Sequence, residues 1–197
     1  MNVGITINEI VRDFLFQFGH VYTTTYYREE NPNAITSLKL WEFYDFQNIE
    51  SPDHNTIEIV DEIEEYTNFI ENEAALDIYG FAPEMYKGAI NDLNHLFQLI
   101  SEKGHTLTLI DKAIDNQLAG TLFFLSKNSF KGNRIRFVSN FESVLQEMDL
   151  FITAEPDLLS LVPEKTVKIN CSYNHTNSVK HSYDSLSGLI QDISTWL

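Results

Sequence analysis

The chain has 197 residues and a formal net charge of −16, with 43% hydrophobic and 13% aromatic side chains. This length suits one domain, or one core domain with an inserted subdomain, and the apolar content suffices for a substantial buried core. The scarcity of Lys and Arg argues against a nucleic-acid backbone or an anionic membrane surface as partner, because both require clustered positive charge.

The first part of the chain mixes regular apolar patterns with an irregular aromatic stretch. Its predicted elements are a buried strand at residues 2–7, a helix at 9–20, an irregular segment at 21–57 and an acidic helix at 58–77. Between Lys39 and Lys87 the sequence contains no Lys or Arg. This stretch interrupts the regular pattern of the rest, so we interpret residues 20–82 as a mostly helical cap inserted after the first strand.

From residue 83 onward, strands and helices alternate. The predicted elements are a helix at 83–104, a strand at 105–110, a helix at 115–127, a strand at 134–138, a short helix at 140–148, strands at 149–153 and 166–170, and a terminal helix from 186. This alternation predicts an α/β fold, a three-layer Rossmann-like parallel sheet, with residues 1–19 and 83–197 as the core. We expect residues 2–8 at the centre of the sheet, with Thr6 and Thr153 ending adjacent strands.

The sequence contains one cysteine, Cys171, which excludes an internal disulfide framework and a cysteine metal cluster. The six histidines lack the spacing of a metal site, so we expect neither a metal nor a cofactor. The N-terminus has no basic segment followed by a long apolar core, and no apolar run approaches a membrane span. We therefore expect no signal-peptide secretion and no membrane partner.

The segment TINEIVRDF follows the first predicted strand. With the order of elements, it resembles the haloacid dehalogenase-like superfamily, in particular its deoxyribonucleotidase-like branch, which is common in bacteriophage genomes. In that branch the first strand ends in Asp-x-Asp-Gly, often continuing Val-Leu-Arg-Asp-Phe, and Val11, Arg12, Asp13 and Phe14 match this tail. The resemblance covers nearly the whole chain and implies an α/β core with a helical cap after the first strand.

The resemblance also implies that the family's catalytic positions are degenerate here. In the family one Asp attacks phosphorus, a second Asp acts as general acid and base, a hydroxyl and a Lys hold the phosphoryl oxygens, and distal acids help to hold Mg²⁺. The corresponding positions hold Thr6 and Asn8 for the two aspartates, Glu9 for the following glycine, Asp111 for the hydroxyl, Asn140 near the absent or displaced Lys, and Thr153 and Ala154 for the distal acids. Asp111 would repel a phosphate. Glu155 could hold a cation together with Asp111, but such a site would be a remnant of the family's metal site and not a working centre.

These replacements lead us to expect no catalytic residues and no enzymatic activity. The expected function is that of a catalytically inactive structural or protein-interaction module, with a bacteriophage virion component (neck, ring or tail-associated) as its natural context. Its partners would be phage structural proteins, a host factor or further copies of the chain, in the virion or the host cytoplasm. The alternative is a phosphatase or nucleotidase acting on nucleoside monophosphates with a diverged active site.

An interaction surface is expected in the cap. It would combine aromatic and acidic side chains, a composition typical of protein interfaces, at Tyr22, Tyr26, Trp41, Tyr44, Glu62 and Glu65. The alternative, that these aromatic side chains only pack the cap onto the core, stays open at this point.

Overall fold

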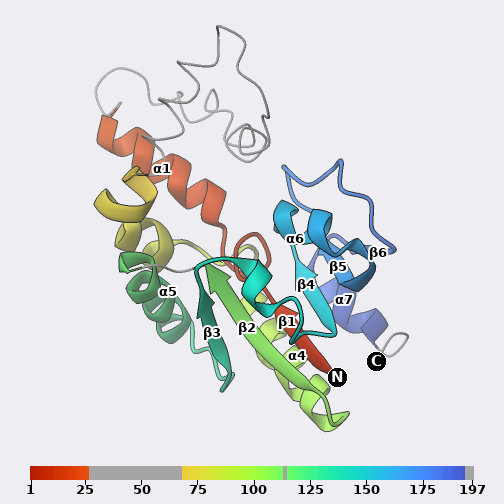
Figure 1. The fold of residues 1–197 in the computed structure, drawn as a ribbon. Coiled ribbons are helices and arrows are strands. Elements are labelled where there is room, and N and C mark those ends of the chain that lie inside the picture. The colour runs from red at the N-terminus through yellow and green to blue at the C-terminus, as the bar shows by residue number, and fades with distance from the viewer. Residues whose placement is uncertain (27–67, 113–114, 194–197) are drawn as a thin grey trace, which may run out of the picture.

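The computed structural model describes residues 1–26, 68–112 and 115–193, which are built around a parallel sheet (Figure 1). The strands lie in the order β3-β2-β1-β4-β5-β6, and every neighbouring pair is parallel. Their bounds are β1 Asn2–Ile5, β2 Thr106–Lys112, β3 Ile135–Val138, β4 Leu150–Thr153, β5 Thr166–Ile169 and β6 His181–Tyr183. The predicted single parallel sheet with its first strand inside is confirmed, whereas β6 was not predicted.

The helices connect these strands and cover the sheet. Their bounds are α1 Phe14–Tyr26, α4 Ala89–Glu102, α5 Asn116–Lys127, α6 Pro156–Leu161 and α7 Leu186–Asp192, with short π-helical turns η2 Phe69–Glu73 and η3 Leu76–Gly80 and 3₁₀ turns η4 Phe141–Val144 and η5 Pro163–Lys165. No helix in the described part of the chain is long and apolar enough to cross a bilayer.

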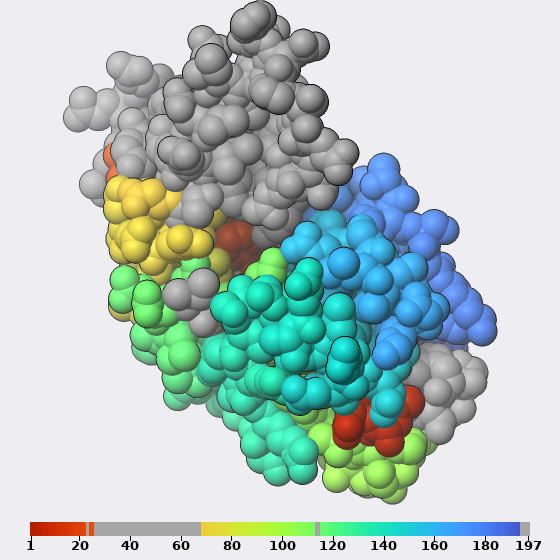
Figure 2. Space-filling view, viewed as in Figure 1, coloured from red at the N-terminus to blue at the C-terminus, as the bar shows by residue number. Residues whose placement is uncertain are grey.

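The two faces of the sheet pack against different layers. One face carries Val3, Ile5 and Leu109 in the main apolar core, to which α4 and α7 contribute their buried sides. The opposite face packs against η4 and α6 through a smaller cluster of Ile110, Val138, Phe141, Val144, Met148, Phe151 and Leu158. Figure 2 shows the teal segment after β3 and the blue α6 region on the side toward the viewer. The predicted three-layer α/β class is confirmed.

The helix predicted at residues 9–20 begins only at Phe14. The chain between β1 and this helix turns instead, and Glu9 has a φ of +57° that a helix does not tolerate. The carboxylate of Asp13 accepts a hydrogen bond from the backbone N–H of Phe16 at 3.3 Å, as a helix-capping residue does. The predicted start is therefore wrong, because the turn and its cap displace the helix by about one turn.

Other predicted helix boundaries differ in the same way. The helix predicted at 83–104 spans Ala89–Glu102 and starts after Gly88, whose φ is +95°. The helix predicted at 140–148 is reduced to the 3₁₀ turn η4. The end of the predicted terminal helix, residues 194–197, lies outside the described residues.

The proposed division into a core and a cap at residues 20–82 stays a prediction, because residues 27–67 lie outside the described part. Helix α1 packs against η3, and η3 in turn packs against α5. Tyr22 is buried, with its ring edge-on to Phe69 at 5.2 Å between centroids, which agrees for this residue with the alternative that the aromatic side chains pack internally. The other expected interface residues, namely the side chain of Tyr26 with Trp41, Tyr44, Glu62 and Glu65, lie outside the described residues.

Replacing Gly4 by Ala should destabilise the sheet. A Cβ atom at Gly4 would lie 2.7 Å from Ile110 Cδ1 and 3.0 Å from a ring carbon of Phe151. Overpacking of this kind costs about 1–3 kcal/mol of unfolding free energy, measurable as a lower urea midpoint at constant m-value. Gly188→Ala in α7 is the matched control, because its nearest neighbour is 3.8 Å away. A Gly4→Ala protein as stable as wild type would contradict the close packing.

Candidate active site

The carboxyl ends of β1 and β4 meet at the centre of the sheet. The chain leaves β1 toward β2 and β3 on one side and reaches β4 on the other, so this is the topological switch point, where open α/β sheets bind ligands. The hydroxyls of Thr6 and Thr153 are hydrogen-bonded at 3.0 Å in a buried position. The prediction that these two residues end adjacent strands is confirmed.

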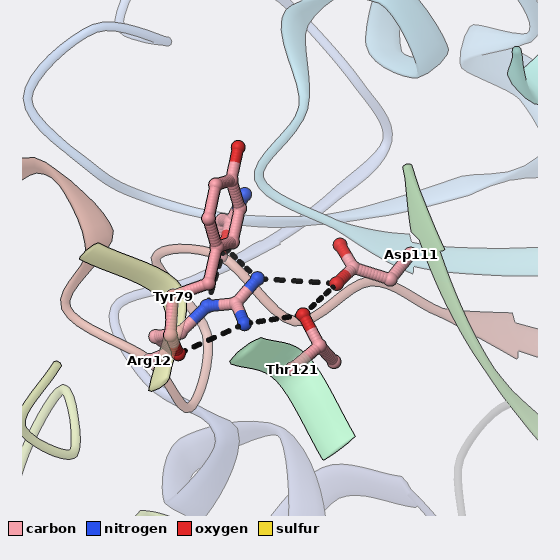
Figure 3. A network of polar contacts seen from close by, with 5 residues as sticks. Arg12, Tyr79, Asp111 and Thr121 are labelled. Carbon is pink, nitrogen blue, oxygen red and sulfur yellow. Dashed lines mark hydrogen bonds and ion pairs between the residues drawn. The ribbon is translucent and has the colours of Figure 1, made fainter. Parts of the chain in front are cut away.

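A fully buried arginine, Arg12, organises the residues beside this point (Figure 3). Its Nε and Nη2 donate to Asn8 Oδ1 at 2.8 and 2.6 Å. Its Nη1 donates to Thr121 Oγ1 at 2.7 Å and to the Tyr79 carbonyl at 3.4 Å, while Nη2 also donates to Asp111 Oδ2 at 3.2 Å. These five contacts equal the number of N–H donors of a guanidinium, so Arg12 is completely satisfied.

Asp111 is therefore not the bare acid that the sequence suggested. Its Oδ2 accepts hydrogen bonds from Arg12 and, at 2.6 Å, from the Thr121 hydroxyl. The buried guanidinium compensates the carboxylate, which removes the expected repulsion of a phosphate as an argument against anion binding. Sequence reasoning treated Arg12 only as part of a matching segment and missed this pairing.

The same network orients the side-chain amide of Asn8. Because a guanidinium can only donate, the atom of Asn8 that faces Arg12 must be its carbonyl oxygen, and the amide NH₂ must point the other way. Within the described residues this NH₂ has no hydrogen-bond acceptor, yet it is not sealed from solvent. Asn8 thus presents two open donors at the end of β1.

Glu155 supplies an acid at the end of β4. Its backbone N–H donates to Thr153 Oγ1 at 2.9 Å, while its carboxylate, only 9% exposed as a residue, accepts no hydrogen bond from any described residue. Burial raises the pKa of Glu155 to about 7; Lys112 lowers this pKa, and Asp111 and Asp157 raise it. A carboxyl with this pKa exchanges protons readily at neutral pH.

Lys112 lies at the end of β2, beside Glu155. Its Nζ donates to Asp157 Oδ2 at 2.7 Å and lies 4.9 Å from the centre of the Phe141 ring. A pocket of about 290 Å³ opens here, lined by Lys112, Asn140, Phe141, Glu142, Pro156, Asp157, Ser160 and Leu161. The ammonium therefore shares a pocket with Asn140, near which the resemblance places a lysine. The sequence signal was available, since Lys112 directly follows Asp111.

The described residues contain no cluster of metal-ligating side chains. Among them no three or more His, Cys, Asp or Glu side chains are grouped so that they could hold a metal. Asp111 is engaged by Arg12, and Asp157 by Lys112. The remnant cation site expected from Glu155 and Asp111 stays a prediction, and Arg12 already compensates one of its two charges.

Comparison of the sequence with protein-family models and with curated proteins finds no match. Solved structures do match. A hydrolase from Pseudomonas syringae superposes with a TM-score of 0.60 at 11% identity, covering 100% of this chain and 98% of its own. A protein described as a haloacid dehalogenase-like hydrolase, from Burkholderia xenovorans, gives 0.57 at 12% identity over 99% and 97%. One described as a β-phosphoglucomutase, from Thermotoga maritima, gives 0.60 at 10% over 100% and 99%.

The chain has the haloacid dehalogenase-like fold. The structures that share this fold over almost the whole chain carry the names of enzymes, and no similarity indicates a phage structural role. The expectation of a non-enzymatic virion or interaction module is therefore corrected. The alternative expectation, an enzyme with a diverged active site, stays open, and the phage branch of the resemblance finds no support in these structures.

Within this haloacid dehalogenase-like fold, Glu9 stands where the resemblance places a glycine. Its φ of +57° lies in the region that favours glycine, which explains why the family pattern has one there. The carboxyl of Glu9 is buried and accepts a hydrogen bond from the backbone N–H of Leu15 at 3.0 Å. Burial raises the pKa of Glu9 to about 8, with the charges of Asp13 and Glu155 raising it further and the Leu15 hydrogen bond lowering it.

The raised pKa of Glu9 predicts that stability falls with increasing pH. Because the folded protein holds this proton more tightly than the unfolded chain, the stabilisation is complete below pH 4.5 and is lost as the pH rises to about 8. Between pH 6 and 8 the loss should be about 2 kcal/mol. Urea unfolding measured across this pH range should give an unfolding free energy that depends less on pH for Glu9→Gln than for wild type. Glu164→Gln, a control at an exposed position, should keep the pH dependence of the wild type. If the unfolding free energy of Glu9→Gln changes with pH as steeply as that of wild type, the raised pKa of Glu9 is contradicted.

Proposed function

We propose that this protein is a hydrolase of small phosphate monoesters, with nucleoside monophosphates as the first class to test. The observation that carries the proposal is Glu155, a buried carboxyl with a pKa of about 7 and no protein hydrogen-bond partner among the described residues, at the switch point of the sheet. Retaining an unpartnered carboxyl in such a position costs stability, and groups of this kind are characteristic of functional sites.

Three groups would divide the work. The ammonium of Lys112 would bind the phosphate, and the open amide NH₂ of Asn8 would donate to one of its oxygens. The Glu155 carboxylate would take a proton from a water molecule as the water oxygen attacks phosphorus. The bond from phosphorus to the ester oxygen would break, and Glu155 would return the proton to that oxygen, giving an alcohol and phosphate.

The route differs from the family's covalent chemistry. Thr6 stands at the nucleophile position, but its hydroxyl is buried and bonded to Thr153. A direct attack by water needs no nucleophilic side chain, so the replacement of the aspartate at Thr6 does not exclude hydrolysis. The pocket of about 290 Å³ lies at the lower end of the range for ligand sites and suits a small phosphorylated group.

The test of this function is phosphate release from a panel of nucleoside monophosphates by the purified full chain. Lys112→Gln should lower kcat/KM about 10–100-fold, mostly through KM, because a charge-assisted contact to the substrate is lost. Its stability should change little, since Lys112 and Asp157 are each about 41–42% exposed as side chains.

Lys127→Gln is the matched control, because this lysine lies on α5 against Phe81 and does not line the Lys112 pocket. It should hydrolyse the same substrates at the wild-type rate. No release above background by the wild type across the panel would contradict the proposed function, and equal kcat/KM for wild type and Lys112→Gln would remove Lys112 from it.

A further inference from the structure

The second face of the sheet is not covered along its whole length. On this face the carboxyl half of the strands meets the apolar cluster under η4 and α6. The amino half carries polar residues instead, contributed by three adjacent strands and their ends: Asn2, Thr106, Thr108, Arg134 and Arg136. A parallel sheet buried on both faces would have apolar side chains here, so this half of the face is built to meet water or a ligand.

The register of the strands explains why these side chains gather. Asn2 pairs with Thr106 and Ile110 pairs with Arg136, and alternate residues of a strand point to the same face. Together they line a hollow of about 430 Å³, bordered also by Asn133, Ile135, Glu147 and Met148. Figure 2 shows the red N-terminal atoms and the teal atoms of the β3 region on this same side of the molecule.

The charge of this hollow is opposite to that of the chain. The protein has a net charge of −16 with only 13 basic residues, yet the hollow is lined by two arginines, Arg134 and Arg136, and by one acid, Glu147. Arg136 is held by a two-pronged ion pair with Glu147. Arg134 is exposed, and within the described residues its guanidinium has neither an ion pair nor a hydrogen bond.

The neighbouring hydroxyls are also open. Thr106 and Thr108 are partly exposed, and their side chains make no hydrogen bond to another described residue. A guanidinium fork beside two hydroxyl donors matches the oxygens of a phosphate group, which accepts several hydrogen bonds at once. The turn that supplies the basic residues is too short for a nucleic-acid surface, and the hollow has the size of a small-molecule site.

We propose that this hollow is a second anion site, which binds the phosphate group of a small molecule through Arg134, Thr106 and Thr108. It lies toward the amino ends of β1, β2 and β3, whereas Lys112 and Glu155 lie at carboxyl ends of strands. The site is therefore independent of the proposed hydrolysis. Arg136 lines the hollow but is not assigned to the phosphate, since both of its terminal nitrogens are paired with Glu147.

The test is a titration of the ¹⁵N-labelled full chain with inorganic phosphate at constant ionic strength, followed by amide chemical shifts. Saturable shifts are expected at Thr106, Thr108 and Arg134, with a Kd that rises about 10–100-fold in Arg134→Gln. Thr108→Val, which keeps the shape and removes the hydroxyl, should also weaken binding. Lys112→Gln and Lys127→Gln should leave these shifts and this Kd unchanged.

A parallel titration with methylphosphonate distinguishes an organic phosphate from the free phosphate ion as the ligand. Binding of both ligands indicates that the site accepts a phosphate group that carries an organic substituent. Binding of inorganic phosphate alone would assign the site to the free ion. The proposal is overturned if no saturable shift occurs at these amides, if Arg134→Gln binds like wild type, or if Lys127→Gln weakens binding equally. Shifts confined to Asn8, Lys112 and Glu155 would overturn it while supporting the proposed hydrolase site.

Discussion

Replacing Arg12 by Met should lower the free energy of unfolding by about 3–5 kcal/mol. The substitution leaves the carboxylate of Asp111, which is 3% exposed, without its cation, and it removes both donors to the Asn8 carbonyl oxygen. An uncompensated buried charge is among the most costly single changes in a protein, whereas the lost apolar contacts of the Arg stem are largely kept by Met. Urea unfolding of the purified variant measures the loss.

A double substitution isolates the electrostatic part of this effect. Arg12→Met with Asp111→Asn removes both charges, and it should recover a substantial part of the stability lost in Arg12→Met alone. Arg136→Met is the matched control for losing an ion-paired arginine, because its pair with Glu147 is solvent-exposed and should contribute little to stability. A loss below about 1 kcal/mol for Arg12→Met would contradict the buried network.

The features of the fold that depend on short apolar runs could be predicted from the sequence. A strand buried on both faces is apolar along most of its length, so the runs at 2–7 and 149–153 indicate strands by composition, whereas 105–110 alternates Thr with Leu, the period-2 pattern of a strand with one open face. Their alternation with helices then makes the sheet parallel, which brings Thr6 and Thr153 together at one edge. That adjacency is the part of the candidate site that sequence reasoning placed.

The polar part of the site could not be placed in the same way. Arg12 reaches Asn8, Thr121 and Asp111 across separations of 4, 109 and 99 residues, and only a folded chain brings such groups within hydrogen-bond distance. Comparing each position with a family pattern treats every replacement as a separate loss. Asp111 was therefore interpreted as an acid facing the ligand, although its charge is compensated from the segment that follows β1.

Lys112 illustrates a related difficulty. A lysine side chain is long and flexible, so the same ammonium position can be reached from the end of β2 or from the segment after β3, where Asn140 lies. A pattern tied to one sequence position finds only one of these solutions. The absence of a lysine near Asn140 was therefore a weak argument for lost activity. The pocket that Lys112 and Asn140 share becomes visible only in the folded structure.

Replacing Glu155 by Gln should reduce hydrolysis about 10²–10⁴-fold, because a general base is lost while the shape of the side chain is kept. In the wild type, kcat/KM should rise with pH through the pKa of about 7 and level off above it, since the ionised carboxylate is the form that accepts a proton. This rise should be absent from the residual activity of Glu155→Gln. Glu102→Gln, at the exposed end of α4, should keep the wild-type profile and rate.

Stability separates this catalytic role from a structural one. The pKa of Glu155 is raised in the folded protein, so its contribution to stability is complete below pH 4.5 and is lost as the pH rises to about 7. Above pH 7 the buried carboxylate opposes folding, and Glu155→Gln should therefore be more stable than wild type while it is nearly inactive. Such an exchange of stability for activity is characteristic of functional residues, whereas a residue kept for the fold would lose stability when replaced. A Glu155→Gln protein that is less stable than wild type at pH 8, or that keeps full activity, would contradict its assignment as the general base.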